Sequence, residues 1–203
     1  MGTDEKTMFA TARSRIKAWI AAGAGSAAAI AVAGMMGAFG ALHRPPAVLA
    51  PGQPIDTGQW LATPRRAYLS GEGAYGLPLK PGDRALVVEI ELENRTAQSG
   101  KDYFDLLRPL TPIGEPDAKP FVVLTRDETM SPALQPGLPE RMAYVWAMPD
   151  GSTPPKAVTL AIDGKVYKAQ DNLYGTPGWF NRHELGTLTM PVGADATTPD
   201  LRP

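Results

Sequence analysis

Cysteine is absent from all 203 residues of this chain. Its absence excludes disulfide bonds, thiolate metal sites, a cysteine nucleophile and a lipidated N-terminal cysteine. Histidine is scarce, and His43 and His183 are the two imidazoles available as a base. A serine nucleophile needs such a base beside it, and the chain contains no G-x-S-x-G sequence. We therefore expect a protein that is not an enzyme and that holds neither a metal nor a cofactor; a hydrolase built on His183 is one alternative.

Charge of either sign is in little excess, since the net charge is −1. The chain therefore has no overall attraction for a polyanion, and nucleic-acid binding has no support. The charges are unevenly spread, however. Residues 1–17 carry four Lys or Arg and two Asp or Glu, whereas residues 43–203 carry 16 and 19. Between these segments, residues 18–42 carry no charged side chain.

This uncharged segment of 25 residues, from Ala18 to Leu42, predicts a transmembrane helix. As a helix it would be about 37 Å long, and a bilayer's hydrocarbon core is about 30 Å thick. The excess of basic residues before it predicts that residues 1–17 stay in the cytoplasm and that the rest is exported. We expect the chain in the bacterial inner (cytoplasmic) membrane with a periplasmic domain. A cleaved signal peptide is the alternative, although its apolar region is shorter, about 7–15 residues.

Small side chains dominate the predicted helix, with Ala or Gly at 16 of the 25 positions. Small residues allow membrane helices to approach closely. One face of the helix is smooth and consists of Ala24, Ala27, Ala31, Gly34, Ala38 and Ala41. This face predicts packing against a helix of another membrane protein; a general preference of the genome for Ala and Gly would explain it equally well.

Prolines at 45, 46, 51 and 54 predict a semi-rigid stalk over residues 43–58. After the stalk, apolar residues alternate with polar ones, as in half-buried antiparallel strands. The clearest strand is 84–94, with Glu89, Glu91 and Glu93 expected in water, and 141–148 is expected to be central. Weaker strands are expected at 59–69, 103–108, 121–126, 157–162, 165–170 and 185–190, with a hairpin turn at Asp163-Gly164. We expect a β-sandwich of seven or eight strands over 59–192 and a C-terminal tail over 193–203.

Three sequence pieces, "ALVVEIELEN", "LQPGLPERMAYVWAMP" and "AVTLAIDGKVYKA", resemble the telokin-like, immunoglobulin-fold domains of small bacterial membrane-anchored proteins. The resemblance covers residues 57–192, and "NLYGTPGWFNRHE" departs from the pattern. It implies an immunoglobulin-like sandwich with a binding or accessory role and no catalytic motif.

Other motifs have simple interpretations. The G-x-G-x-x-G match at 71–76 is followed by Pro78 and Pro81, which prevent the helix that a dinucleotide site requires, so we expect a flexible surface loop. The pair Arg65-Arg66 is expected at a solvated edge. A candidate binding patch on a bent loop consists of Tyr174, Trp179, Phe180 and Arg182.

Two functions fit these expectations. The first is a non-enzymatic accessory subunit that packs its helix and docks its exported domain on other membrane-protein subunits. The alternative is an anchored periplasmic module that binds an envelope glycan or a small molecule through the aromatic patch.

Overall fold

The computed structural model describes residues 28–36, 46–71, 74–77, 79–114, 118–173 and 175–193. The chain divides into two compact units, Met1–Pro45 and Pro46–Pro203. In the first unit, residues 28–35 are helical. Ala31 and Gly34 of the predicted smooth face belong to this helix and are exposed, while Ala24, Ala27, Ala38 and Ala41 lie outside the described residues. Among the described residues, no helix has both the length and the apolar character needed to cross a membrane.

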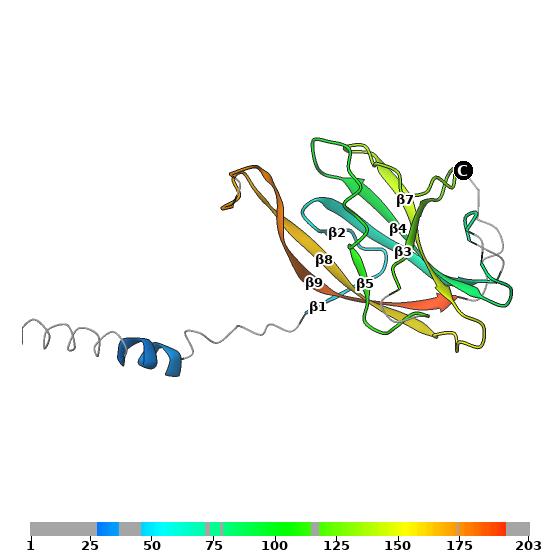
Figure 1. The fold of residues 1–203 in the computed structure, drawn as a ribbon, viewed down its shortest axis with the longest axis horizontal. Helices are drawn as coiled ribbons and strands as arrows, with labels where there is room; N and C mark the ends of the chain where they lie inside the picture. The colour runs from blue at the N-terminus through cyan, green and yellow to red at the C-terminus, as the bar shows by residue number, and fades with distance from the viewer. Residues whose placement is uncertain are drawn as a thin grey trace, which may run out of the picture. The chain divides into compact units, whose positions relative to one another are not determined.

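The described residues of the second unit are mainly β and form nine strands (Figure 1). They are β1 (Ala47–Leu49), β2 (Ile55–Asp56), β3 (Trp60–Ser70), β4 (Arg84–Asn94), β5 (Leu107–Pro109), β6 (Phe121–Leu124), β7 (Pro139–Met148), β8 (Ala157–Lys168) and β9 (Gly178–Gly193). Hydrogen bonds join them in the order β5-β8-β9-β3-β4-β7-β6, with β1 added beside β9 and β2 beside β3. Most pairs are antiparallel, as the alternating sequence predicts.

The sheet curls into two facing halves because β3 belongs to both. β3 pairs with β4 along its length, but only its end meets β9, where Ala67 and Tyr68 lie parallel to Val192 and Gly193. Where β3 meets β9, the sheet folds over. One half contains β1, β5, β8 and β9, and it faces the other half, which contains β2, β3, β4, β7 and β6. One apolar core forms between the halves and contains buried side chains from β4, β7, β8 and β9. The predicted mainly β sandwich is thereby confirmed at the level of its class.

The two clearest strands are found where the sequence predicts them. β4 covers Arg84–Asn94, and its Leu86, Val88, Ile90 and Leu92 are all fully buried in the core. β7 lies between β4 and β6, so it is central, as its apolar character on both faces predicts. Its second face packs under a smaller apolar cluster on the outside of the sandwich.

The loop expected to be flexible helps to cover this outer face. Ala74 and Leu77 are buried there against β4 and β7 side chains such as Val87 and Val145. Glu89, expected in water, is only 2% exposed. The expectation for Glu89 is wrong because the outer face of this half is a second packed surface and not a solvated one, and Ala74 of the loop is buried in it.

The predicted hairpin turn at Asp163-Gly164 is also wrong. β8 runs through both residues, with register shifts against β9 on either side of them. A side chain at position 164 would put its Cβ 2.9 Å from Leu185 Cδ1 and 3.1 Å from the Thr57 carbonyl oxygen. The glycine is therefore needed for close packing at an irregular part of the strand, and not for a turn.

Two short pieces of the predicted stalk, residues 47–49 and 55–56, are strands of the sheet. Ala47–Leu49 pairs in parallel with β9, opposite Gly186, Thr187 and Leu188. Ile55–Asp56 pairs with β3. Proline is tolerated beside short edge strands because their outer N–H groups need no partner, so the prolines at 51 and 54 do not prevent this pairing.

Candidate functional site

The ends of β8 and β9 form a two-stranded ribbon that extends past the rest of the sheet (Figure 1). β5 pairs with β8 only over residues 160–162, and β1 pairs with β9 only over residues 186–188. Beyond these positions β8 and β9 pair as strands only with each other in the described part of the chain. At the base, the backbone N–H groups of Asp163 and Lys165 still donate to the carbonyl oxygens of Leu106 and Thr57. We call residues 163–173 and 178–184 the β8–β9 arm.

The predicted aromatic residues lie in this arm, but on a strand and not on a bent loop. Trp179 pairs with Tyr167, and Phe180 pairs with Val166. Successive residues of a strand point to opposite faces, so the two rings do not converge in one patch. The centres of the Trp179 and Tyr167 rings are 5.4 Å apart. Lys168 Nζ lies 6.0 Å from the centre of the Phe180 ring. Tyr174 lies outside the described residues.

Apolar side chains are exposed along the arm. Val166 is 47% exposed, Tyr167 54% and Leu173 76%. The strand edges near these residues have no partner strand among the described residues. An exposed apolar ribbon with free edges can bind an extended segment of another chain through main-chain hydrogen bonds.

Arg182, the fourth predicted patch residue, fastens the base of the arm. Its Nε and Nη2 donate to Asp163 Oδ2 at 2.8 and 2.6 Å, and Nη2 also donates to the Asp105 carbonyl oxygen at 3.0 Å. These bonds cross from β9 to β8 and to the segment before β5. Arg182 is therefore a structural link in this arrangement and is not directed toward an outside partner.

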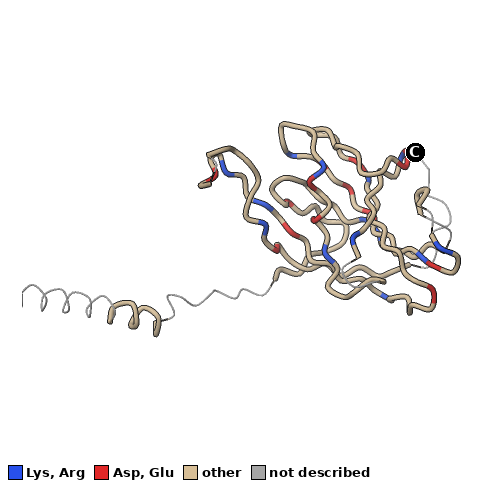
Figure 2. The backbone as a smooth tube through the Cα atoms, in the orientation of Figure 1, with Lys and Arg blue, Asp and Glu red and all other residues tan. Residues whose placement is uncertain are grey.

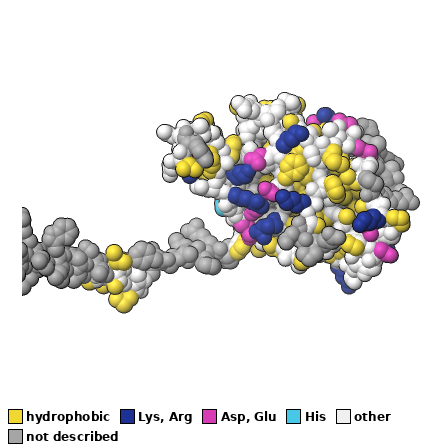
Figure 3. Space-filling model, viewed as in Figure 1, with side chains coloured by type: hydrophobic (Ala, Val, Ile, Leu, Met, Phe, Trp, Pro, Cys, Tyr) yellow, Lys and Arg dark blue, Asp and Glu magenta, His cyan; other side chains and the backbone are white. Residues whose placement is uncertain are grey.

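Further ion pairs surround this link. Arg108 pairs with Glu184 at 2.8 Å, and Lys165 pairs with Asp102. Figure 2 shows basic and acidic residues close together along the strands here, and Figure 3 shows Lys and Arg side chains gathered on this face with Asp and Glu between them. The arm is thus held at its base by charges of both signs that are largely paired with each other.

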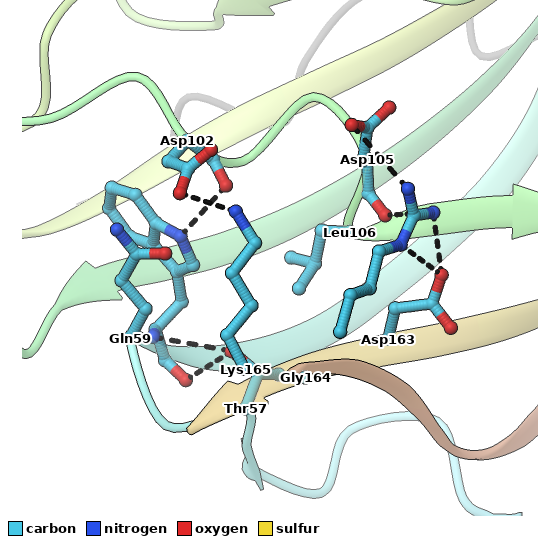
Figure 4. Close-up of a pocket in the computed structure, with 10 residues that line it drawn as sticks. Thr57, Gln59, Asp102, Asp105, Leu106, Asp163, Gly164 and Lys165 are labelled. Carbon is cyan, nitrogen blue, oxygen red and sulfur yellow. Dashed lines mark hydrogen bonds and ion pairs between the residues drawn. The ribbon is translucent and has the colours of Figure 1, made fainter. Parts of the chain in front are cut away.

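A small cavity lies beneath these ion pairs (Figure 4). Thr57, Gln59, Leu106 and Lys165 contribute to its lining, and its volume is about 20 Å³. Gln59 Oε1 is buried there and has no hydrogen-bond partner among the described residues. A space of this size accommodates one water molecule, which would satisfy Gln59. The cavity is too small for a substrate.

A second polar cluster lies on the outer face of the sandwich. Glu89 Oε1 accepts hydrogen bonds from Arg66 Nη2 at 2.7 Å, Tyr75 OH at 2.7 Å and Tyr68 OH at 3.2 Å, and Glu89 Oε2 accepts one from Arg66 Nε.

Burial acts to raise the pKa of Glu89, but the hydrogen bonds from Arg66 and Tyr75 outweigh it and hold the pKa below its usual range. Burial, together with the hydrogen bonds to Tyr68 and Glu89, raises the pKa of Tyr75 far above its usual range. The carboxylate is fully bonded, so the cluster holds the loop onto the sheet. The Arg66 side chain is 40% exposed, so it is partly solvated as expected, but its guanidinium is bound to the buried Glu89.

His183 is exposed on β9, and its Nδ1 lies 2.9 Å from the Asn181 carbonyl oxygen. Its ring forms no hydrogen bond with a Ser or Thr hydroxyl of the described residues. The hydrolase alternative therefore gains no support from this position. His43 lies outside the described residues.

No family model matches the chain, and no curated protein matches it. Among solved structures, the chain is similar to an uncharacterized β-sandwich protein from Clostridium difficile 630. The two share 15% sequence identity with a TM-score of 0.47, over 74% of this chain and 97% of that one.

Proposed function

We propose that the chain is a membrane-anchored, non-enzymatic accessory subunit whose exported β-sandwich docks on another membrane protein through the β8–β9 arm. The observation that carries the proposal is the exposure of Val166, Tyr167 and Leu173 on a ribbon that projects from the sheet. Isolated apolar residues are common on protein surfaces, but a projecting ribbon with free edges is normally protected by charge or by a partner.

The anchor in this proposal is residues 18–42. Support comes from the absence of charge over these 25 residues and from the basic residues before them. The helical residues 28–35 lie inside this segment, and Ile30, Val32 and Met35 on them are exposed. The small face with Ala31 and Gly34 would pack on a partner's helix. The anchor places the sandwich on the periplasmic side.

An immunoglobulin-like assignment of the sandwich is part of the proposal. It is supported by the strand order, because β3-β4-β7-β6 and β5-β8-β9 correspond to the ABED and CFG sheets of that fold. Domains of this class commonly bind other proteins, and the resemblance of the sequence to telokin-like domains implies the same binding or accessory role.

In this proposal, the arm binds an extended segment from the exported part of another membrane protein. The segment would add to the free edge of β8 or β9 and cover Val166 and Leu173. The arm is suited to this because the Arg182 bonds to Asp163 and Asp105 fix its base. A preorganised site loses less conformational entropy on binding.

The test uses the full chain extracted from native membranes in a mild detergent. A Val166→Asp/Leu173→Asp double variant places two charges on the arm, and Leu138→Asp is the matched control, since Leu138 is 54% exposed on the connection before β7. We expect the wild type and the control to migrate in a large complex and the arm variant to migrate alone. A photo-crosslinker at position 173 should join the partner, and one at 138 should not. A wild-type chain that migrates as a monomer would exclude the proposal.

A further inference from the structure

β8 passes through the arm as a regular strand, whereas β9 does not. Between the paired positions Ile162–Gly186 and Val166–Phe180, β8 advances four residues and β9 advances six. Both extra residues therefore lie in β9, at the two register shifts of the pair. Since β8 has no inserted residue, its backbone N–H and C=O groups point in turn toward β9 and away from it along its whole length.

The groups of β8 that point away from β9 are already used at the base of the arm. The Asp163 N–H donates to the Leu106 carbonyl oxygen at 3.1 Å, and the Lys165 N–H donates to the Thr57 carbonyl oxygen at 3.0 Å. Tyr167 is the next residue whose backbone groups point the same way. Its N–H forms no backbone hydrogen bond outside the β8–β9 pair among the described residues. The edge of β8 is thus bound twice by main-chain oxygens and is then free at Tyr167.

The matching edge of β9 is less suited to accept another strand. Its second register shift contains Asn181, whose φ of 54° lies in the left-handed region. The Asn181 carbonyl oxygen also lies 2.9 Å from His183 Nδ1. Bulges bend a strand and are a common protection of exposed sheet edges. Of the two edges of the arm, the edge of β8 is therefore the one that can be extended.

The side chains beside Tyr167 determine which segment fits this edge. Val166 and Lys168 lie on one face of the arm, and Tyr167 lies with Trp179 on the other, because successive strand residues alternate. The second face is turned toward the connection between β2 and β3, since a Cβ at Gly58 would lie 3.0 Å from Trp179 Cζ3. The face with Val166 and Lys168 is therefore the one left for a partner.

Lys168 supplies the charge of this open face. Its Nζ lies 6.0 Å from the centre of the Phe180 ring, and it forms no ion pair with a described residue. The other cations of the arm, Lys165 and Arg182, are both bound to aspartates of this chain. Opposite charges on neighbouring strands attract each other. An acidic side chain on an added strand would therefore find an available partner in Lys168.

We propose that the segment bound by the arm adds as a strand to the free edge of β8 at Tyr167 and carries an acidic side chain that contacts Lys168. The proposal rests on the docking function above and adds to it the edge that is used and the chemistry of the partner. An apolar side chain of the segment lies against Val166. Residues on one face of a strand are two positions apart, so one residue separates the acidic and the apolar side chain. Main-chain hydrogen bonds supply affinity, and these alternate side chains supply specificity.

The first experiment compares charge variants of the full chain in complexes extracted from native membranes in a mild detergent. We expect Lys168→Glu to reduce the complexed fraction several-fold, because it places like charges together. Lys168→Arg keeps the charge and should keep the complex. Lys80→Glu makes the same charge change at an exposed lysine outside the arm, and it should leave the complexed fraction unchanged.

The second experiment locates the edge in the wild-type complex. The amide of Tyr167 should exchange slowly in the complex and quickly in the chain alone, while amides of residues 178–184 exchange equally in both. Photo-crosslinkers at positions 166 and 168 should capture the partner, and one at position 179 should not. The captured segment should contain an acidic and an apolar residue separated by one position.

The outcomes separate this inference from the function on which it rests. A wild-type chain that migrates alone would overturn both. A complex that survives Lys168→Glu, new protection at 178–184 in place of Tyr167, or a captured segment without an acidic residue would each overturn the inference alone and leave the docking function intact. If Lys168→Glu does not fold, the exchange at Tyr167 and the sequence captured by the wild-type chain decide the question.

Discussion

Arg66 of β3 donates to both carboxylate oxygens of Glu89 on β4, through Nε to Oε2 at 2.9 Å and through Nη2 to Oε1 at 2.7 Å. The two residues face each other across the central strand pair. Two planar groups joined by parallel hydrogen bonds make the strongest ion-pair geometry available to side chains. Because Glu89 is almost fully buried, its charge depends on this partner and on the tyrosine hydroxyls.

We expect Glu89→Gln to destabilise the unit by about 2–4 kcal/mol at pH 7, because a buried polar network loses its charge partner. Glu91→Gln is the matched control, since Glu91 lies on the same strand and its pair with Arg65 is partly exposed. The control should change stability by less than about 1 kcal/mol. Urea unfolding of the full chain in detergent measures both, and equal effects would contradict a special role for Glu89.

The lowered pKa of Glu89 also predicts how stability depends on pH. A carboxylate with a lower pKa in the folded state stabilises that state above its unfolded pKa, and this contribution disappears as the pH falls through the folded value. We therefore expect wild-type stability to decline from the unfolded pKa of Glu downward. Glu89→Gln should show a shallower decline over the same range, in melting curves taken at successive pH values.

Asn94 is a second polar group whose loss should be costly. It is 1% exposed; its Nδ2 donates to the carbonyl oxygens of Gln98 and Leu134 at 2.8 Å, and its Oδ1 accepts from Thr96. We expect Asn94→Ala to destabilise the unit by about 2–4 kcal/mol, since several buried groups lose their partners. Gln98→Ala keeps the carbonyl and should change little. Thermal unfolding distinguishes the two variants.

Gly186 tests whether β1 is bound to the sheet. A Cβ at this position would clash with the Ala47 carbonyl oxygen, whereas a Cβ at Gly193 would meet its nearest neighbour at 3.8 Å. We expect Gly186→Ala to detach β1 from β9 and to increase amide hydrogen exchange over residues 47–49. Gly193→Ala should leave that exchange unchanged. If residues 47–49 exchange quickly in the wild type as well, the pairing is not stable in solution.

The strands that the sequence predicts correctly are those in which the alternation of apolar and polar residues is enough to determine the structure. In β4 the apolar residues occupy every second position, and burying them requires a strand of that register. The outer face was misjudged because the same alternation places Glu89 opposite the core, and nothing local indicates that Arg66 and the loop at 74–77 cover it. Such coverage depends on contacts between residues far apart in sequence.

The arm could be predicted only in part. Asp163-Gly164 has the composition of a turn, yet both residues lie within β8. Asp163 accepts hydrogen bonds from Arg182, and Gly164 allows the Leu185 side chain to pack closely. The sequence drew attention to Trp179, Phe180 and Arg182 as neighbours but gave no indication that strand alternation separates the rings. Trp146 lies on the predicted central strand 141–148, and nothing in the sequence indicates that its Nε1 has no hydrogen-bond partner among the described residues.

Arg182 provides the last prediction, because it connects the arm to the sandwich. Removing its guanidinium leaves Asp163, whose side chain is only 9% exposed, with the weaker contact to Arg108 at 4.0 Å. We expect Arg182→Gln to loosen the arm and to raise amide exchange several-fold over residues 163–168, while exchange in β4 and β7 stays the same. Arg126→Gln is the control, because it removes an exposed arginine paired with Glu140 on the other half of the sheet. Exchange that rises equally across the whole sandwich would show a global loss of stability in place of a hinge at this residue. An unchanged arm would mean that the β8–β9 pairing alone holds it in position.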